Sequence, residues 1–82
     1  MRRIVYFTAS WCGPCKAFKP VLKEVTSQLG IPVEYVDVDT NPGKAQEFGV
    51  SSVPTMFVYN DNTILFRQSG AMSKDQLKSK LS

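Results

Sequence analysis

The only two cysteines of the chain, Cys12 and Cys15, stand three residues apart between a strand-like and a helix-like segment. Residues 3–8 (RIVYFT) are rich in β-branched and aromatic side chains, which predicts a short buried strand ending just before the cysteines. From Cys12 onward, apolar residues recur every three or four positions up to Leu29, and Gly30 follows. This pattern predicts an amphipathic helix of about four turns. The two cysteines should therefore lie at the start of a helix that packs on a sheet.

A position at a helix start would give the cysteine pair its chemistry. Residues three apart lie on one helix face, close enough for their sulfurs to bond. Free N–H groups and the positive end of the helix dipole favour a thiolate at Cys12, which becomes the nucleophile. Gly13 permits the tight turn, and Pro14 stiffens it where no backbone donor is needed. We expect a redox-active dithiol; two ordinary core cysteines or an inert disulfide are the alternative.

The rest of the chain predicts three more strands and two more helices. Residues 33–38, 55–59 and 63–68 read as strands, the last two forming a hairpin around the polar turn at 60–62. Residues 42–48 and a segment after Ser73 with a capping-box pattern read as helices, and 51–54 as a loop. Pro20 should kink the first helix near residues 16–20 without breaking it. The order β-α-β-α-β-β-α predicts one α/β domain over residues 1–82, without repeats or linkers.

Composition argues against several classes of function. The chain has 82 residues and a net charge of +3, but its lysines are scattered rather than gathered in a stripe that would bind nucleic acid. It has no histidine and only two cysteines, so a metal site would require two chains to share a cluster. No apolar run approaches the roughly 20 residues of a membrane span, and no leader pattern is visible. We expect a cytoplasmic protein, in which paired cysteines indicate redox chemistry.

Three segments resemble the thioredoxin family. They are WCGPCK (residues 11–16), NPGKAQEFGVSSVPT (41–55) and GAMSKDQLK (70–78), and the resemblance extends from about Val5 to Leu81. The first segment distinguishes thioredoxins from glutaredoxins, whose usual pattern is C-P-Y-C. The resemblance implies a minimal thioredoxin fold: a four-stranded mixed sheet with three helices, lacking the family's usual first strand and helix. Residues 33–38 would then form a sheet edge.

The resemblance also implies roles for individual residues. Cys12 and Cys15 would be catalytic, within an active-site loop completed by Trp11, Gly13, Pro14 and Lys16. Substrate would contact Val53, Pro54, Gly70 and Ala71. A cis peptide bond before Pro54 would expose the backbone of Val53 for pairing with an extended substrate. The alternatives are an ordinary trans proline at a strand start and a Trp11 that serves only in packing.

Two positions depart from the family. Tyr6 stands where the family usually has a buried Asp, and Tyr35 stands where that Asp has its Lys partner. Replacing a buried charged pair by two aromatic residues can be neutral or stabilising. The family's Asp helps to deprotonate the cysteine matched by Cys15. Because a phenol is a poor base at neutral pH, we expect slower attack by Cys15 than in relatives with the Asp.

The expected activity is reduction of disulfides in protein substrates by a monomer without a bound cofactor or metal. The resemblance implies recharging by NADPH through a thioredoxin reductase. A glutathione-coupled, glutaredoxin-like reductant is one alternative. A partner-clamping subunit in which the dithiol is dispensable is another. The sequence predicts no nucleic-acid or membrane partner.

Overall fold

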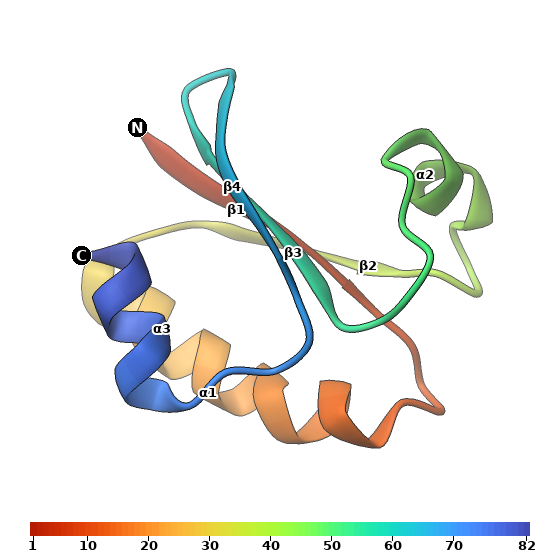
Figure 1. Cartoon of the computed structure of the whole chain (residues 1–82), viewed down its shortest axis with the longest axis horizontal. Coiled ribbons are helices and arrows are strands. Elements are labelled where there is room, and N and C mark those ends of the chain that lie inside the picture. Colours follow the sequence, from red (N-terminus) through yellow and green to blue (C-terminus); the bar gives the residue numbers. More distant parts are fainter.

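The computed structural model describes all residues from 1 to 82 and contains four strands and three helices in the predicted order (Figure 1). The elements are β1 (Arg2–Thr8), α1 (Gly13–Leu29), β2 (Val33–Asp37), α2 (Pro42–Glu47), β3 (Thr55–Asn60), β4 (Thr63–Ser69) and α3 (Lys74–Leu81). The predicted boundaries differ from these by one residue at most. No helix is both long and apolar enough to span a bilayer.

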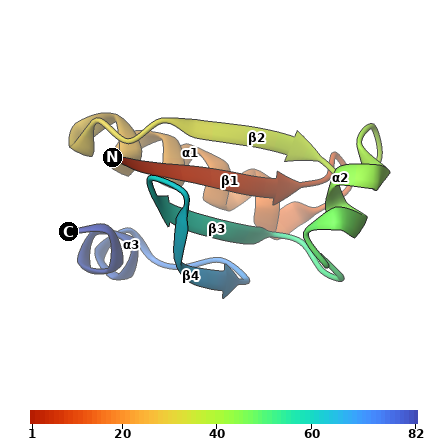
Figure 2. The same cartoon turned by 90° about the horizontal axis from the view of Figure 1, so that it is seen from above.

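The four strands form one mixed sheet in the order β2-β1-β3-β4. β1 lies inside the sheet, parallel to β2 and antiparallel to β3, and β3 and β4 form the antiparallel hairpin (Figure 2). Residues Ile4, Val5, Tyr6 and Phe7 are all buried, because an interior strand is covered on both faces. β2 lies at an edge, as predicted from the resemblance. The carboxyl ends of β1 and β2 therefore meet at the same end of the sheet.

The helices divide the core into two layers. α1 and α3 cover one face of the sheet and α2 covers part of the other (Figure 1). The cluster beneath α1 and α3 consists of Ile4, Tyr6, Phe18, Leu22, Val25, Met56, Val58, Leu77 and Leu81. The cluster on the opposite face consists of Val5, Phe7, Val36, Ala45, Phe57 and Tyr59. Phe66 on β4 is only partly buried and packs against the first cluster.

Helix α1 begins and ends where the sequence signals predict. Cys12 is its N-cap, and Gly30 ends it with a φ of 68°, a left-handed conformation that glycine adopts without strain. α1 continues without a break through Pro20. A single continuous helix therefore connects the cysteines to the far end of the sheet.

Helix α3 begins with the predicted capping box. The backbone N–H of Gln76 donates to Ser73 Oγ at 3.2 Å, and the backbone N–H of Ser73 donates to Gln76 Oε1 at 3.1 Å. An ion pair of 2.9 Å between Lys74 and Glu24 joins α3 to α1. The ion pair, together with Leu77 and Leu81 in the core cluster beneath both helices, holds α3 beside the helix that carries the cysteines.

Candidate active site

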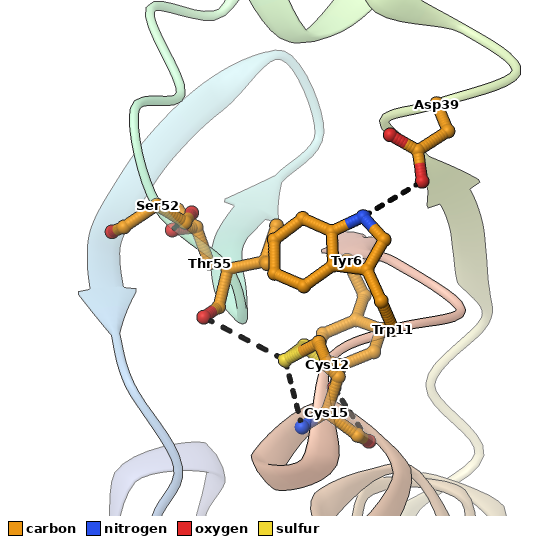
Figure 3. Close-up of a disulfide and its surroundings, with 8 residues drawn as sticks. Tyr6, Trp11, Cys12, Cys15, Asp39, Ser52 and Thr55 are labelled. Carbon is orange, nitrogen blue, oxygen red and sulfur yellow. Dashed lines mark hydrogen bonds between the residues drawn. A yellow bond between two sulfur atoms is a disulfide. The ribbon is translucent and has the colours of Figure 1, made fainter.

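Cys12 and Cys15 form a disulfide at the point where β1 gives way to α1 (Figure 3). After Thr8 ends β1, the chain turns through residues 9–11, and the N–H of Cys12 donates to the carbonyl oxygen of Ala9 at 3.2 Å. The Cα atoms of the two cysteines are 5.2 Å apart. Cys12 is 4% exposed and Cys15 is 0% exposed. Cys12 is thus the cysteine that an incoming molecule can reach first.

The sulfur of Cys12 caps helix α1. The backbone of Cys12 is extended, and the N–H of Cys15 donates to Cys12 Sγ at 3.1 Å. Pro14 lies in the first turn, where its missing N–H leaves no carbonyl unpaired. A helix N-terminus stabilises negative charge on a capping atom. Once the disulfide is opened, this geometry favours the thiolate of Cys12, as the sequence predicts.

The loop before β3 faces the disulfide. The peptide bond between Val53 and Pro54 is cis, and the carbonyl oxygen of Val53 lies 3.8 Å from Cys12 Sγ. The N–H of Gly70 donates to the carbonyl oxygen of Pro54 at 2.8 Å. Val53, Pro54 and Gly70, which the resemblance assigns to substrate binding, therefore lie together beside Cys12. Ala71 follows Gly70 in the chain and is exposed.

Trp11 lies on the surface next to the disulfide. Its side chain is 68% exposed, so it is not the packing residue of the alternative interpretation. The indole N–H donates to Asp39 Oδ2 at 2.8 Å (Figure 3). We did not predict Asp39 as a partner of Trp11. The available signal was its place just after β2, because parallel β1 and β2 bring their following loops to the same end of the sheet.

An apolar pocket of about 130 Å³ adjoins the indole of Trp11. It is lined by Trp11, Val38, Val50, Ser51, Ser52 and Val53. The lining joins the loop before β3 to the segment after β2. A mostly apolar hollow next to a reachable sulfur can hold a side chain of a molecule bound at Cys12.

Tyr6 lies beneath the disulfide and is completely buried. Its hydroxyl donates to the carbonyl oxygen of Cys15 at 3.2 Å. Its ring packs edge-on against Tyr35, its direct neighbour on β2, with centroids 5.9 Å apart. The two aromatic residues that replace the family's charged pair are thus in contact.

Burial sets the protonation state of both tyrosines. Burial raises the pKa of Tyr6 to about 12; a hydrogen bond with Thr8 acts in the opposite direction and repulsion from Tyr35 adds to the rise. Burial also raises the pKa of Tyr35. Tyr6 is therefore a neutral hydrogen-bond donor at physiological pH and does not act as a base toward Cys15.

The structure contains no group of three or more His, Cys, Asp or Glu residues able to hold a metal ion.

Comparisons with known proteins agree with this geometry. A family model described as Thioredoxin matches residues 1–82. The thioredoxin of Mycolicibacterium smegmatis is 42% identical over 83 residues, which cover 96% of this chain and 74% of that protein. The bifunctional thioredoxin reductase/thioredoxin of Mycobacterium leprae is 44% identical over 96% of this chain and 18% of that protein. The structure of a mutant thioredoxin from Halobacterium salinarum matches with a TM-score of 0.89 and 33% identity, covering 96% of this chain and 70% of that one.

Proposed function

The chain belongs to the thioredoxin family, and on this premise we propose how its dithiol reduces the disulfides of proteins. As a family member, it is a thiol–disulfide oxidoreductase of the disulfide-reductase type. In the reduced protein the thiolate of Cys12 attacks one sulfur of a substrate disulfide. That disulfide bond breaks, its other sulfur leaves as a thiolate that takes up a proton, and Cys12 is left in a mixed disulfide with the substrate.

Cys15 completes the transfer. Its thiol gives its proton to water or to the departing thiolate, and the resulting thiolate attacks Cys12 Sγ. The second substrate sulfur is released, the Cys12–Cys15 disulfide forms, and two electrons have passed to the substrate. The 5.2 Å between the two Cα atoms supports this closure without movement of the helix. Because Tyr6 keeps its proton, we expect this second step to be slower than in relatives with a carboxylate there.

The substrate segment would lie across the loop before β3. The carbonyl of Val53 faces Cys12 at 3.8 Å, and the Pro54–Gly70 hydrogen bond ties the two substrate-facing loops together. Backbone pairing at Val53 requires no particular substrate sequence, which fits broad substrate tolerance. The exposed indole of Trp11 and the neighbouring Ala71 would form the rim of this surface. Gly13, Pro14 and Lys16 would complete the active-site loop.

Electrons would come from NADPH through a thioredoxin reductase, with no cofactor bound to this chain. The Mycobacterium leprae relative is named a bifunctional thioredoxin reductase/thioredoxin, which supports a thioredoxin reductase as the direct donor. We place the protein in the cytoplasm as a monomer. No observation favours the glutathione-coupled reductant or the clamping subunit.

The test is reduction of insulin with two recycling systems. NADPH with a thioredoxin reductase should support turnover, and NADPH with glutathione and glutathione reductase should not. Cys15→Ser should stop turnover and accumulate a mixed disulfide at Cys12, detected as a mass increase that dithiothreitol removes. Cys12→Ser is the matched control and should form no such adduct. Equal trapping by both variants would contradict the assigned roles.

A further inference from the structure

A second cleft, lined mainly by polar and charged residues, lies where residues 8–10 meet helix α1, apart from the apolar pocket next to Trp11. Its volume is about 260 Å³, whereas a single water needs roughly 10–15 Å³. It is lined by Thr8, Ala9, Ser10, Lys16, Lys19 and Asp37, none of which lines the apolar pocket. Residues 8–10 lead directly into the active-site loop, and Lys16 directly follows Cys15. Ala9, which lines the cleft, also packs with Cys12 and Cys15, so a substrate bound at Cys12 can place a neighbouring group in the cleft.

The cleft carries more positive than negative charge. Lys16 and Lys19 lie one turn apart on the same side of α1, and both are exposed. Neither belongs to any of the three ion pairs of the structure. Lys19 Nζ lies 5.0 Å from the centroid of the Tyr35 ring, a cation–π contact that restricts the Lys19 side chain. Asp37 is the only carboxylate of the lining, and its Oδ1 accepts the N–H of Asp39 at 2.8 Å.

We propose that this cleft binds a carboxylate of the disulfide-bearing substrate, supplied by an Asp or Glu a few residues from the attacked cysteine. Two ammonium groups and one carboxylate leave one unit of positive charge, which a single carboxylate neutralises. The exposed Ser10 adds a hydroxyl that can donate to the same oxygens. This inference rests on the proposed function and adds to it a preference for disulfides with acidic neighbours.

General attraction between a chain of net charge +3 and acidic molecules would produce a similar preference without any cleft. The two explanations differ in which lysines matter. Lys23 lies on α1 one turn beyond Lys19, is exposed and does not line the cleft. Lys23→Gln therefore removes the same charge from the same helix and serves as the matched control for Lys19→Gln.

The experiment uses short peptides closed by one disulfide, identical except for Glu or Gln at a single position two, three or four residues from either cysteine. The second-order rate at which each peptide oxidises the reduced full-length protein is measured by acid quenching. This needs no electron donor. At low ionic strength we expect Glu to react roughly three- to tenfold faster than Gln at one or more positions, the range of one or two exposed ion pairs. The ratio should fall toward one in about 0.5 M salt.

Three lysine variants then show whether the preference for Glu peptides arises at the cleft. Lys16→Gln and Lys19→Gln should each lower the Glu/Gln rate ratio, while Lys23→Gln should leave it at the parent value; circular dichroism confirms that all three are folded. A parent ratio of one at every position would overturn the proposal, as would an equal loss of the ratio in Lys23→Gln. Failure of the Gln peptides to oxidise the parent at all would instead reject the proposed function itself.

Discussion

Tyr6→Asp, which restores the residue usual in the family, should destabilise the oxidised protein by about 4 kcal/mol or more. Tyr6 is 0% exposed and packs against Phe18 and Tyr35, and truncation of a buried aromatic ring costs about 3–5 kcal/mol. The hydrogen bond from Tyr6 to the carbonyl oxygen of Cys15 contributes about 1 kcal/mol more, and an ionised Asp cannot donate it. A domain of this size has a free energy of unfolding of only about 4–12 kcal/mol.

The assay is urea unfolding at pH 7, followed by circular dichroism. With an m value of about 1.5 kcal/mol/M, the midpoint should fall by roughly 3–4 M, and part of the loss should be recovered near pH 4, where the carboxyl is neutral. Tyr6→Phe is the control; it keeps the ring, loses only the hydrogen bond, and should lower the midpoint by less than about 1 M. A Tyr6→Asp midpoint equal to that of the parent would refute the reasoning that the aromatic pair stabilises this fold.

Three single contacts lead to further predictions. The pKa of Tyr6 is about 12 in the folded protein and about 10 in the unfolded chain, so ionisation of Tyr6 favours the unfolded chain by about 2–3 kcal/mol as the pH rises from 10 through 12. The advantage of about 1 kcal/mol that the parent has over Tyr6→Phe below pH 10 should therefore shrink and then reverse across that window in urea titrations, and a constant difference would contradict this prediction. Ser73→Ala removes the capping acceptor of α3 and should lower the free energy of unfolding by about 1 kcal/mol, whereas an unchanged urea midpoint would show that the cap is not needed. Asp39→Ala removes the hydrogen-bond acceptor of the exposed Trp11 indole, so time-resolved fluorescence anisotropy should show faster motion of the only tryptophan, with little change in melting; unchanged anisotropy would mean that the bond does not hold the ring.

The elements that the sequence predicted well are those with a strong local signal. The unbroken apolar run in β1 predicts a strand covered on both faces, and β1 is the interior strand with both neighbours in place. The start of α1 at the cysteines and its end at Gly30 follow from the apolar spacing and a glycine cap. Pro20 was expected to kink α1 without breaking it; the helix is continuous through Pro20, and the kink stays a prediction.

The positions of active-site residues that belong to a sequence motif could be predicted. The hydrogen bonds that depend on how strands and helices pack could not. The resemblance predicted that Val53 and Pro54 would lie beside Cys12, although 41 residues separate Cys12 from Val53 in the sequence. The bond between Trp11 and Asp39 escaped prediction because it joins two loops whose meeting depends on strand order. The bond from Tyr6 to Cys15 also depends on how closely α1 packs on β1, which apolar spacing does not specify.

The disulfide closes a ring of only four residues, and this has a thermodynamic consequence. In the loop-entropy description, such a ring restricts the unfolded chain by about 2 kcal/mol, against about 3 kcal/mol for a fifteen-residue ring. Oxidation, reduction, folding and unfolding form a closed cycle. The difference in unfolding free energy between the oxidised and reduced forms therefore equals the difference between the redox equilibria of the folded and unfolded protein. Each 1.4 kcal/mol of that difference corresponds to about 30 mV. Urea unfolding of the two forms thus measures how far the fold shifts the reduction potential of its own dithiol.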